Sequence, residues 1–181
     1  EIEIDRAIAL AMSGTILTSF GDMMRVPGTN GSLMDARCRG ADVRMVYSID
    51  DAIAIAEKNP ERKVVFFAIG FETTAPTIAA AILRNPPENF SLLASHKLIP
   101  PALMELVDEI RVDAFIAPGH VCTIIGTRPF QQFADMGFPS VVAGFETGDV
   151  LLSILMILKQ IISGEPAVEN AYPRAVKSEG N

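Results

Sequence analysis

The sequence has few cysteines and little charge. Cys38 and Cys122 are the only two cysteines among 181 residues, too few for a disulfide framework. Because it contains no Cys-x-x-Cys pair and no His/Cys cluster, this chain alone offers no typical metal site. Charged residues make up 20% of the chain, and the net charge of −7 comes without a basic stripe. Phosphate contacts need clustered lysines and arginines, so we expect no nucleic-acid partner.

Long apolar runs are absent as well. The most apolar stretch covers residues 150–162, shorter than the ~20 residues of a transmembrane helix. Ser153, Lys159 and Gln160 also interrupt it. The first residues are acidic, unlike a signal peptide. We therefore expect a cytoplasmic protein with no membrane partner. An apolar content of 49% excludes disorder, because such a chain can bury a core.

Short apolar runs alternate with helical patterns. The run from Lys63 to Ile69 is apolar on both faces, which is typical of a strand in a parallel sheet covered on both sides. The pattern predicts strands at 15–20, 43–47, 63–69, 90–94, 114–117 and 140–143. It predicts helices at 3–13, 32–39, 49–58, 74–84, 101–110, 121–125, 129–136 and 148–162. This alternation indicates an α/β fold, with parallel sheets, helices on both faces and right-handed crossovers.

The tetrapeptide Gly-Phe-Glu-Thr occurs twice, at residues 70–73 and 144–147. Each copy follows an apolar run and precedes a helical pattern, so we interpret both as equivalent strand-to-helix loops. Glu72, Thr73 and Thr74 would then lie at the carboxyl edge of a sheet, where ligands bind in such folds. A structural role stays open, above all for the second copy: glycine makes the turn, threonine caps the helix and glutamate faces solvent.

The segment FGDMMRVPG places one acid and one base in a turn fixed by glycines and proline. Asp22 and Arg25 either face a ligand or pair with each other, and the spacing alone favours a surface ion pair. The segment PGHVC places His120 directly after a predicted strand, a position that is hard to explain as core. The thiol of Cys122 is either activated by the imidazole and the helix start or, more typically, inert core. His96 also ends a predicted strand.

Together these motifs resemble a known family. FGDMMRVPG, GADVRMVYS, FFAIGFETTAPT and PGHVCTIIG, in this order and spacing, resemble the HypD family of nickel–iron hydrogenase maturation proteins. The likeness covers residues 1 to about 165. It implies an assembly scaffold with redox assistance, rather than a conventional enzyme, for an iron centre with cyanide and carbon monoxide ligands. The implied partners are HypC, which holds the iron together with HypD, and HypE, which delivers cyanide.

The resemblance also implies a Rossmann-like fold of two α/β domains facing a cleft, and a third region with a 4Fe-4S cluster. Carried over by position, seven residues would line that cleft. The resemblance implies catalytic roles for Glu72, Thr73, Thr74 and His120, and cofactor binding for Asp22, Arg25 and Gly119. The family's cysteine motifs fall outside this stretch. The chain would thus be a central portion that binds neither iron nor cluster alone, and no metal role falls on Cys38 or Cys122.

The expected domains follow from this placement. Residues 1–60 would form an incomplete, two-stranded part of the first α/β domain, residues 61–165 a four-stranded second domain, and residues 166–181 an irregular tail. An incomplete sheet exposes apolar surface, so we expect the chain to associate readily. Two alternative functions remain: a small-molecule-binding α/β enzyme with His120 and Glu72 as acid and base, and a structural interaction module.

Overall fold

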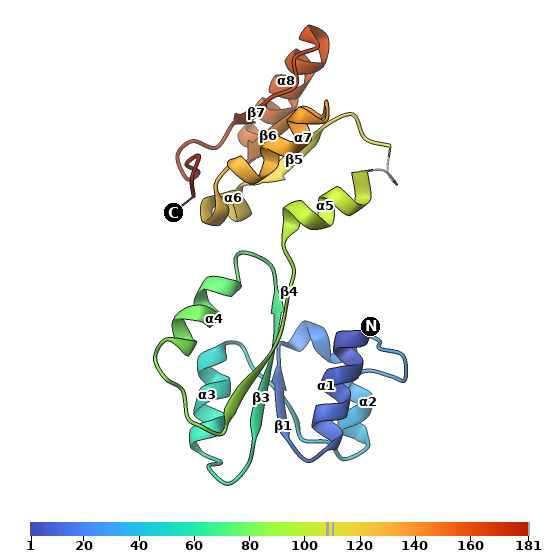
Figure 1. The fold of residues 1–181 in the computed structure, drawn as a ribbon, viewed down its shortest axis with the longest axis vertical. Helices are drawn as coiled ribbons and strands as arrows, with labels where there is room; N and C mark the ends of the chain where they lie inside the picture. Colours follow the sequence, from blue (N-terminus) through green and yellow to red (C-terminus); the bar gives the residue numbers. More distant parts are fainter. Residues whose placement is uncertain (108, 110, 181) are drawn as a thin grey trace. The chain divides into compact units, whose positions relative to one another are not determined.

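The computed structural model describes residues 1–107, 109 and 111–180, and it divides into two compact units (Figure 1). Unit 1 comprises Glu1–Gly70 and Thr74–His96, and unit 2 comprises Phe71–Thr73 and Lys97–Asn181. Every strand pairing between the named strands is parallel. The predicted α/β fold, with parallel sheets and helices on both faces, is confirmed.

Unit 1 contains a four-stranded sheet in the order β2-β1-β3-β4. Its strands are β1 (Ile16–Ser19), β2 (Val43–Met45), β3 (Val64–Gly70) and β4 (Phe90–His96). Both faces of β3 are buried, so Phe66 and Phe67 belong to two different core clusters. One face packs against α1 (Ile2–Met12) and α2 (Leu33–Cys38), and the other against α3 (Ile49–Glu57) and α4 (Ala75–Ile82). A short 3-10 helix, η1 (Gly21–Arg25), follows β1.

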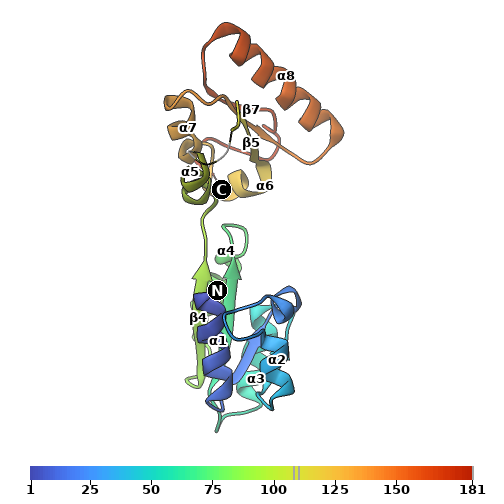
Figure 2. The same ribbon diagram turned by 90° about the vertical axis from the view of Figure 1, so that its right-hand side faces the viewer.

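Unit 2 contains a three-stranded sheet in the order β5-β6-β7. Its strands are β5 (Phe115–Pro118), β6 (Ser140–Ala143) and β7 (Val168–Asn170). Figure 2 shows α8 (Thr147–Ser163) on the opposite side of these strands from α5 (Ile99–Val107) and α7 (Gln131–Asp135). The segments α6 (Gly119–Ile125) and η2 (Arg128–Phe130) pack in the same core cluster as α5 and α7. The end predicted for the α5 helix includes residues 108 and 110, which lie outside the described residues.

The strand pairing corrects the expected domains. We placed a boundary at residue 61, but β3 pairs directly with β1, with Ile16 opposite Val64. The strands β3 and β4 therefore complete the first sheet, and the first unit has four strands, not two. The second sheet has three strands, since β7 lies in the segment expected to be an irregular tail and pairs with β6. A local pattern shows that a strand exists but not which strand it pairs with. A cleft between the units stays a prediction.

Helix α8 buries its polar side and exposes its apolar side, the reverse of an ordinary amphipathic helix. The side chains it buries are mostly polar: Asp149, Ser153, Ile157 and Gln160. Its exposed side is apolar, and Leu151, Leu155, Leu158 and Ile162 are each at least 50% exposed. The spacing of these four residues follows the 4-3-4 pattern of a helix-packing stripe. No helix among the described residues is long and apolar enough to cross a membrane.

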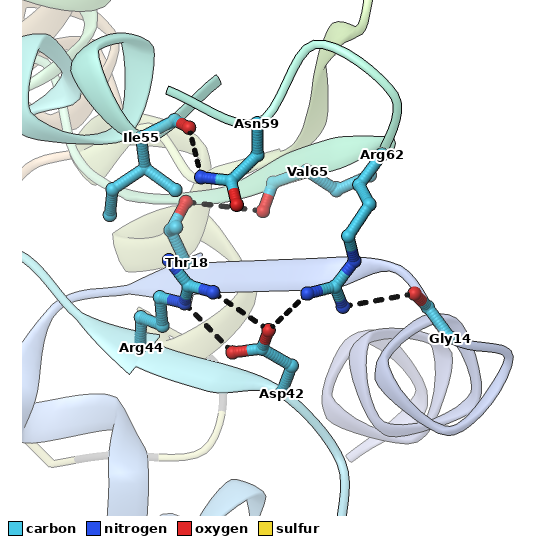
Figure 3. A network of polar contacts seen from close by, with 8 residues as sticks. All are labelled: Gly14, Thr18, Asp42, Arg44, Ile55, Asn59, Arg62 and Val65. Atoms are coloured by element: carbon cyan, nitrogen blue, oxygen red, sulfur yellow. Dashed lines mark hydrogen bonds and ion pairs between the residues drawn. The ribbon is translucent and has the colours of Figure 1, made fainter. Parts of the chain in front are cut away.

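A polar network stabilises the end of the unit 1 sheet where β2 and β3 begin (Figure 3). The Asp42 carboxylate accepts hydrogen bonds from Nε and Nη2 of Arg44, both at 2.8 Å, and from Nη1 of Arg62 at 2.7 Å. Arg62 also donates to the carbonyl of Gly14. The bonds from Arg44, and then those from Arg62, outweigh burial and lower the pKa of Asp42 to about 2. This network ties three loops together and lies away from the predicted site.

Candidate functional site

The first Gly-Phe-Glu-Thr copy begins at the carboxyl end of β3. Gly70 has φ +143°, a conformation that side chains rarely adopt, and a Cβ there would lie 2.5 Å from Oγ1 of Thr74. Thr74 precedes α4, but its side chain makes no capping hydrogen bond. Glycine is therefore required for close packing at this turn, and the hydroxyl of Thr74 lies against the turn instead of capping the helix.

Glu72 of this copy is buried, with only 3% of its surface exposed. Its Oε1 accepts a hydrogen bond from the backbone N–H of Ile99, the first residue of α5, at 2.7 Å. The positive end of the helix dipole favours a carboxylate at that place. The other oxygen, Oε2, is buried and has no hydrogen-bond partner within the described part of the chain. One carboxylate oxygen is thus fixed and the other is left without a donor.

The charge of Glu72 also affects Cys122. Burial, with a smaller contribution from the Glu72 carboxylate, raises the pKa of the Cys122 thiol to about 12. Only the thiolate is a good nucleophile or metal ligand, so a thiol that stays protonated at neutral pH is inert. The structure therefore supports the interpretation of Cys122 as core.

The second copy, residues 144–147, contacts the His120 loop. The ring centroids of His120 and Phe145 are 5.0 Å apart, and the rings are tilted by 35°. Both side chains are exposed. Gly119 lets α6 begin close to β6, because a Cβ at this position would lie 2.4 Å from the carbonyl oxygen of Ala143. Its predicted cofactor contact stays a prediction.

Arg174 anchors the second copy, and sequence reasoning did not find it. Its two terminal nitrogens donate to the two carboxylate oxygens of Asp149, each at 2.7 Å, and it also pairs with Glu146 at 3.2 Å. Its guanidinium lies over the ring of Tyr172. Bonding to Arg174 lowers the pKa of Asp149. Arg174 falls in the segment expected to be irregular, and no local pattern pairs it with a helix 25 residues earlier.

The two copies share a position in the fold but not an environment. Both follow a strand and precede a helix, so the prediction of two strand-to-helix loops is confirmed. Glu72 is buried against α5, whereas the side chain of Glu146 is 81% exposed. The solvated, structural interpretation therefore fits the second copy, and the first copy is the functional candidate.

Comparison with known proteins shows the family to which the chain belongs. A family profile named HypD and described as "Hydrogenase formation hypA family" matches residues 1–181. The chain belongs to the HypD family. The hydrogenase maturation factor HypD of Rhizobium leguminosarum is 50% identical over 98% of this chain and 50% of its own length. HypD of Escherichia coli is 44% identical over 98% of this chain and 50% of its own length.

A protein of Methanocaldococcus jannaschii, provisionally named as a hydrogenase expression/formation protein, is 53% identical over 99% of this chain and 51% of its own length. The chain thus spans about half the length of the curated relatives it matches.

The remaining HypD-type candidates lie in unit 1. Asp22 and Arg25 lie in η1, directly after β1, and both are exposed. The structure describes both residues and shows no ion pair between them, so the surface ion pair that their spacing favoured is wrong. Because Asp22 and Arg25 belong to unit 1 and Glu72 to unit 2, their meeting in one cleft stays a prediction.

His96 is the other histidine at a carboxyl end. It lies opposite Gly70 in the pairing of β3 with β4. Its Nε2 is buried without a hydrogen-bond partner among the residues that the structure describes, and burial lowers its pKa. Burial therefore favours the neutral ring. This position is at the carboxyl edge, as the sequence predicts.

The iron–sulfur cluster implied by the HypD resemblance does not fit the residues of this chain. Such a cluster needs thiolate ligands, usually four. Cys38 is exposed in unit 1, and Cys122 is buried and protonated in unit 2. Within residues 1–107, 109 and 111–180 no three His, Cys, Asp or Glu residues gather as a metal site. We therefore assign no step to a cluster here.

Proposed function

We propose that the chain is the part of a HypD maturation factor that helps to assemble the iron centre of nickel–iron hydrogenases. The iron, with its cyanide and carbon monoxide ligands, is the substrate of this assembly, and proteins of the HypC and HypE types are the partners. The observation that carries the proposal is the environment of Glu72, in a loop of a HypD chain. It is a buried carboxylate with one oxygen fixed by Ile99 and the other without a partner among the residues that the structure describes.

Each candidate residue then has a chemical role. Glu72 is a preorganised hydrogen-bond acceptor, because α5 holds its carboxylate before any substrate arrives. His120, exposed and stacked on Phe145, offers an imidazole that can donate or accept a proton. Thr73 is exposed beside Glu72 and adds a hydroxyl. Thiolates are the ligands that suit low-spin iron. Glu72 and His120 would instead contact the ligands of the iron from outside its coordination shell.

The alternative of a small-molecule enzyme gains no support from the contacts. A general acid and a general base must reach the same substrate. Glu72 contacts α5, whereas His120 contacts Phe145, and no hydrogen bond joins these two described residues. We therefore favour the assembly role.

A complementation experiment tests this proposal. A strain that lacks its own HypD is complemented with the full-length gene carrying Glu72→Gln, and hydrogenase activity is measured. Glu146→Gln is the matched control, because it makes the same change in the exposed copy of the same tetrapeptide. We expect Glu72→Gln to lose most of the activity and Glu146→Gln to keep it. Equal activity of the two variants, at equal soluble protein, would overturn the proposal.

A further inference from the structure

A cavity of about 440 Å³ lies beside Glu72 in unit 2. Its walls are mostly apolar, and they are formed by Leu98, Pro100, Pro101, Ile125 and Pro129. Glu72, Arg128 and Gln132 are its polar residues. A largely apolar cavity of several hundred Å³ with a few fixed polar groups is typical of a small-ligand site.

The backbone around this cavity offers few hydrogen-bond donors. Prolines have no backbone N–H, and two of them occupy the first turn of α5. The N–H of Ile99 is already bound to Glu72, and the N–H of Ala102 donates to the carbonyl of Leu98. The described residues at the start of α5 therefore have no backbone N–H left for a ligand.

The polar residues of the cavity include one acceptor atom without a partner among the described residues. Oε2 of Glu72 is buried and lacks a partner among the described residues. Nε2 of Gln132 donates to the carbonyl of Pro129 at 2.9 Å. The guanidinium of Arg128 donates to Glu179 at 2.6 Å. The cavity thus combines mostly apolar walls with Glu72, whose buried Oε2 lacks a hydrogen-bond donor among the described residues.

We propose that this cavity binds an apolar, indole-sized group that carries one N–H or O–H, and that this group donates to Oε2 of Glu72. The inference goes beyond the proposed function, since it requires neither iron nor a maturation partner. The same chemistry is found in a free aromatic metabolite and in the tryptophan or tyrosine side chain of a partner protein.

Two probes that differ by one methyl group, which replaces the N–H donor, test the proposal. Indole and 1-methylindole are titrated into the 181-residue chain, and binding is followed by NMR on the methyl groups of Leu98 and Ile125. We expect indole to bind about tenfold more tightly, because hydrogen bonds to a buried charged acceptor are strong. Glu72→Gln should bring the two affinities within about twofold, since the amide replaces an acceptor by a donor. Glu146→Gln should keep the tenfold difference.

The comparison of the two probes on the unaltered chain does not depend on any variant folding. Equal affinities for indole and 1-methylindole, or no shift of the Leu98 and Ile125 methyl signals, would overturn the proposal. A capped Ala-Trp-Ala peptide identifies the source: binding at least as tight as that of indole indicates a partner's side chain, and binding of free indole alone indicates a metabolite. Loss of hydrogenase activity in the complementation experiment is a separate readout, so either proposal can fail alone.

Discussion

Gly70 is the point at which the backbone of the functional loop is most constrained. The substitution Gly70→Ala forces a side chain into φ +143° and places its Cβ 2.5 Å from Oγ1 and 2.8 Å from Cβ of Thr74. Strained backbone of this kind costs about 1–3 kcal/mol, and the alanine recovers only about 0.4–1 kcal/mol through the unfolded chain. With the overlap against Thr74 added, we expect a loss of about 2–4 kcal/mol in the free energy of unfolding.

Urea denaturation of the chain, followed by circular dichroism, measures this loss. Gly148→Ala is the matched control, because Gly148 lies in the first turn of α8 with nothing within 4 Å of its ideal Cβ. There alanine should be neutral or stabilising by up to about 1 kcal/mol. If Gly70→Ala is as stable as Gly148→Ala, the described geometry of the loop is wrong.

A double-mutant cycle separates the two causes of the loss. Thr74→Gly removes all three side-chain atoms that the new Cβ would meet, but it leaves the strained φ of residue 70 unchanged. We expect Gly70→Ala to cost about 1 kcal/mol less in the Thr74→Gly background. A cost that is the same in both backgrounds would mean that backbone strain alone accounts for the effect.

Three further predictions concern other parts of the chain. The pKa of Asp42 falls from 3.8 to about 2 on folding, so its ion pairs stabilise the chain above about pH 4, and that stability is lost as the pH falls toward 2. Asp42→Asn should lower the free energy of unfolding by about 1–2 kcal/mol at neutral pH, after allowance for solvent screening. In acid denaturation curves, the difference between the variant and the unaltered chain should shrink. Iodoacetamide should modify exposed Cys38 in the native chain but buried Cys122 only after denaturation, as mass spectrometry would show; native labelling of Cys122 would contradict the inert-core interpretation. The chain should associate through the exposed face of α8, so Leu155→Glu with Leu158→Glu should lower the mass measured by light scattering, and an unchanged mass would exclude that face.

The local sequence pattern predicted the strands, the helices and the loops between them. The buried run that became β3, and the strand-to-helix loops with Glu72 and His120, follow from period, turn residues and apolar content. The pairing of β3 with β1 did not follow, because strand partners are chosen by tertiary packing, and so the expected boundary at residue 61 was misplaced. The segment Val168–Asn170 is short and mixed in polarity, so only its pairing with β6 reveals a strand.

The burial and the contacts of each candidate side chain could not be predicted from the sequence either. Two identical tetrapeptides gave no sign that Glu72 would be buried against α5 while Glu146 stays in solvent. That difference arises from contacts made far along the chain, by Ile99 in one case and by Arg174 in the other. Sequence reasoning located the candidate loops, and tertiary contacts distinguish the functional copy from the structural one.

The most direct test of the central claim, that Glu72 acts on the iron substrate, is infrared spectroscopy of the full-length HypD protein purified with its partners. Cyanide and carbon monoxide bound to iron accept hydrogen bonds, and their stretching bands respond to nearby charges and donors, so replacing the Glu72 carboxylate by an amide changes their surroundings. We predict that Glu72→Gln abolishes or shifts these bands, and that Glu146→Gln leaves them as they are in the unaltered protein. Identical bands in both variants would contradict the claim.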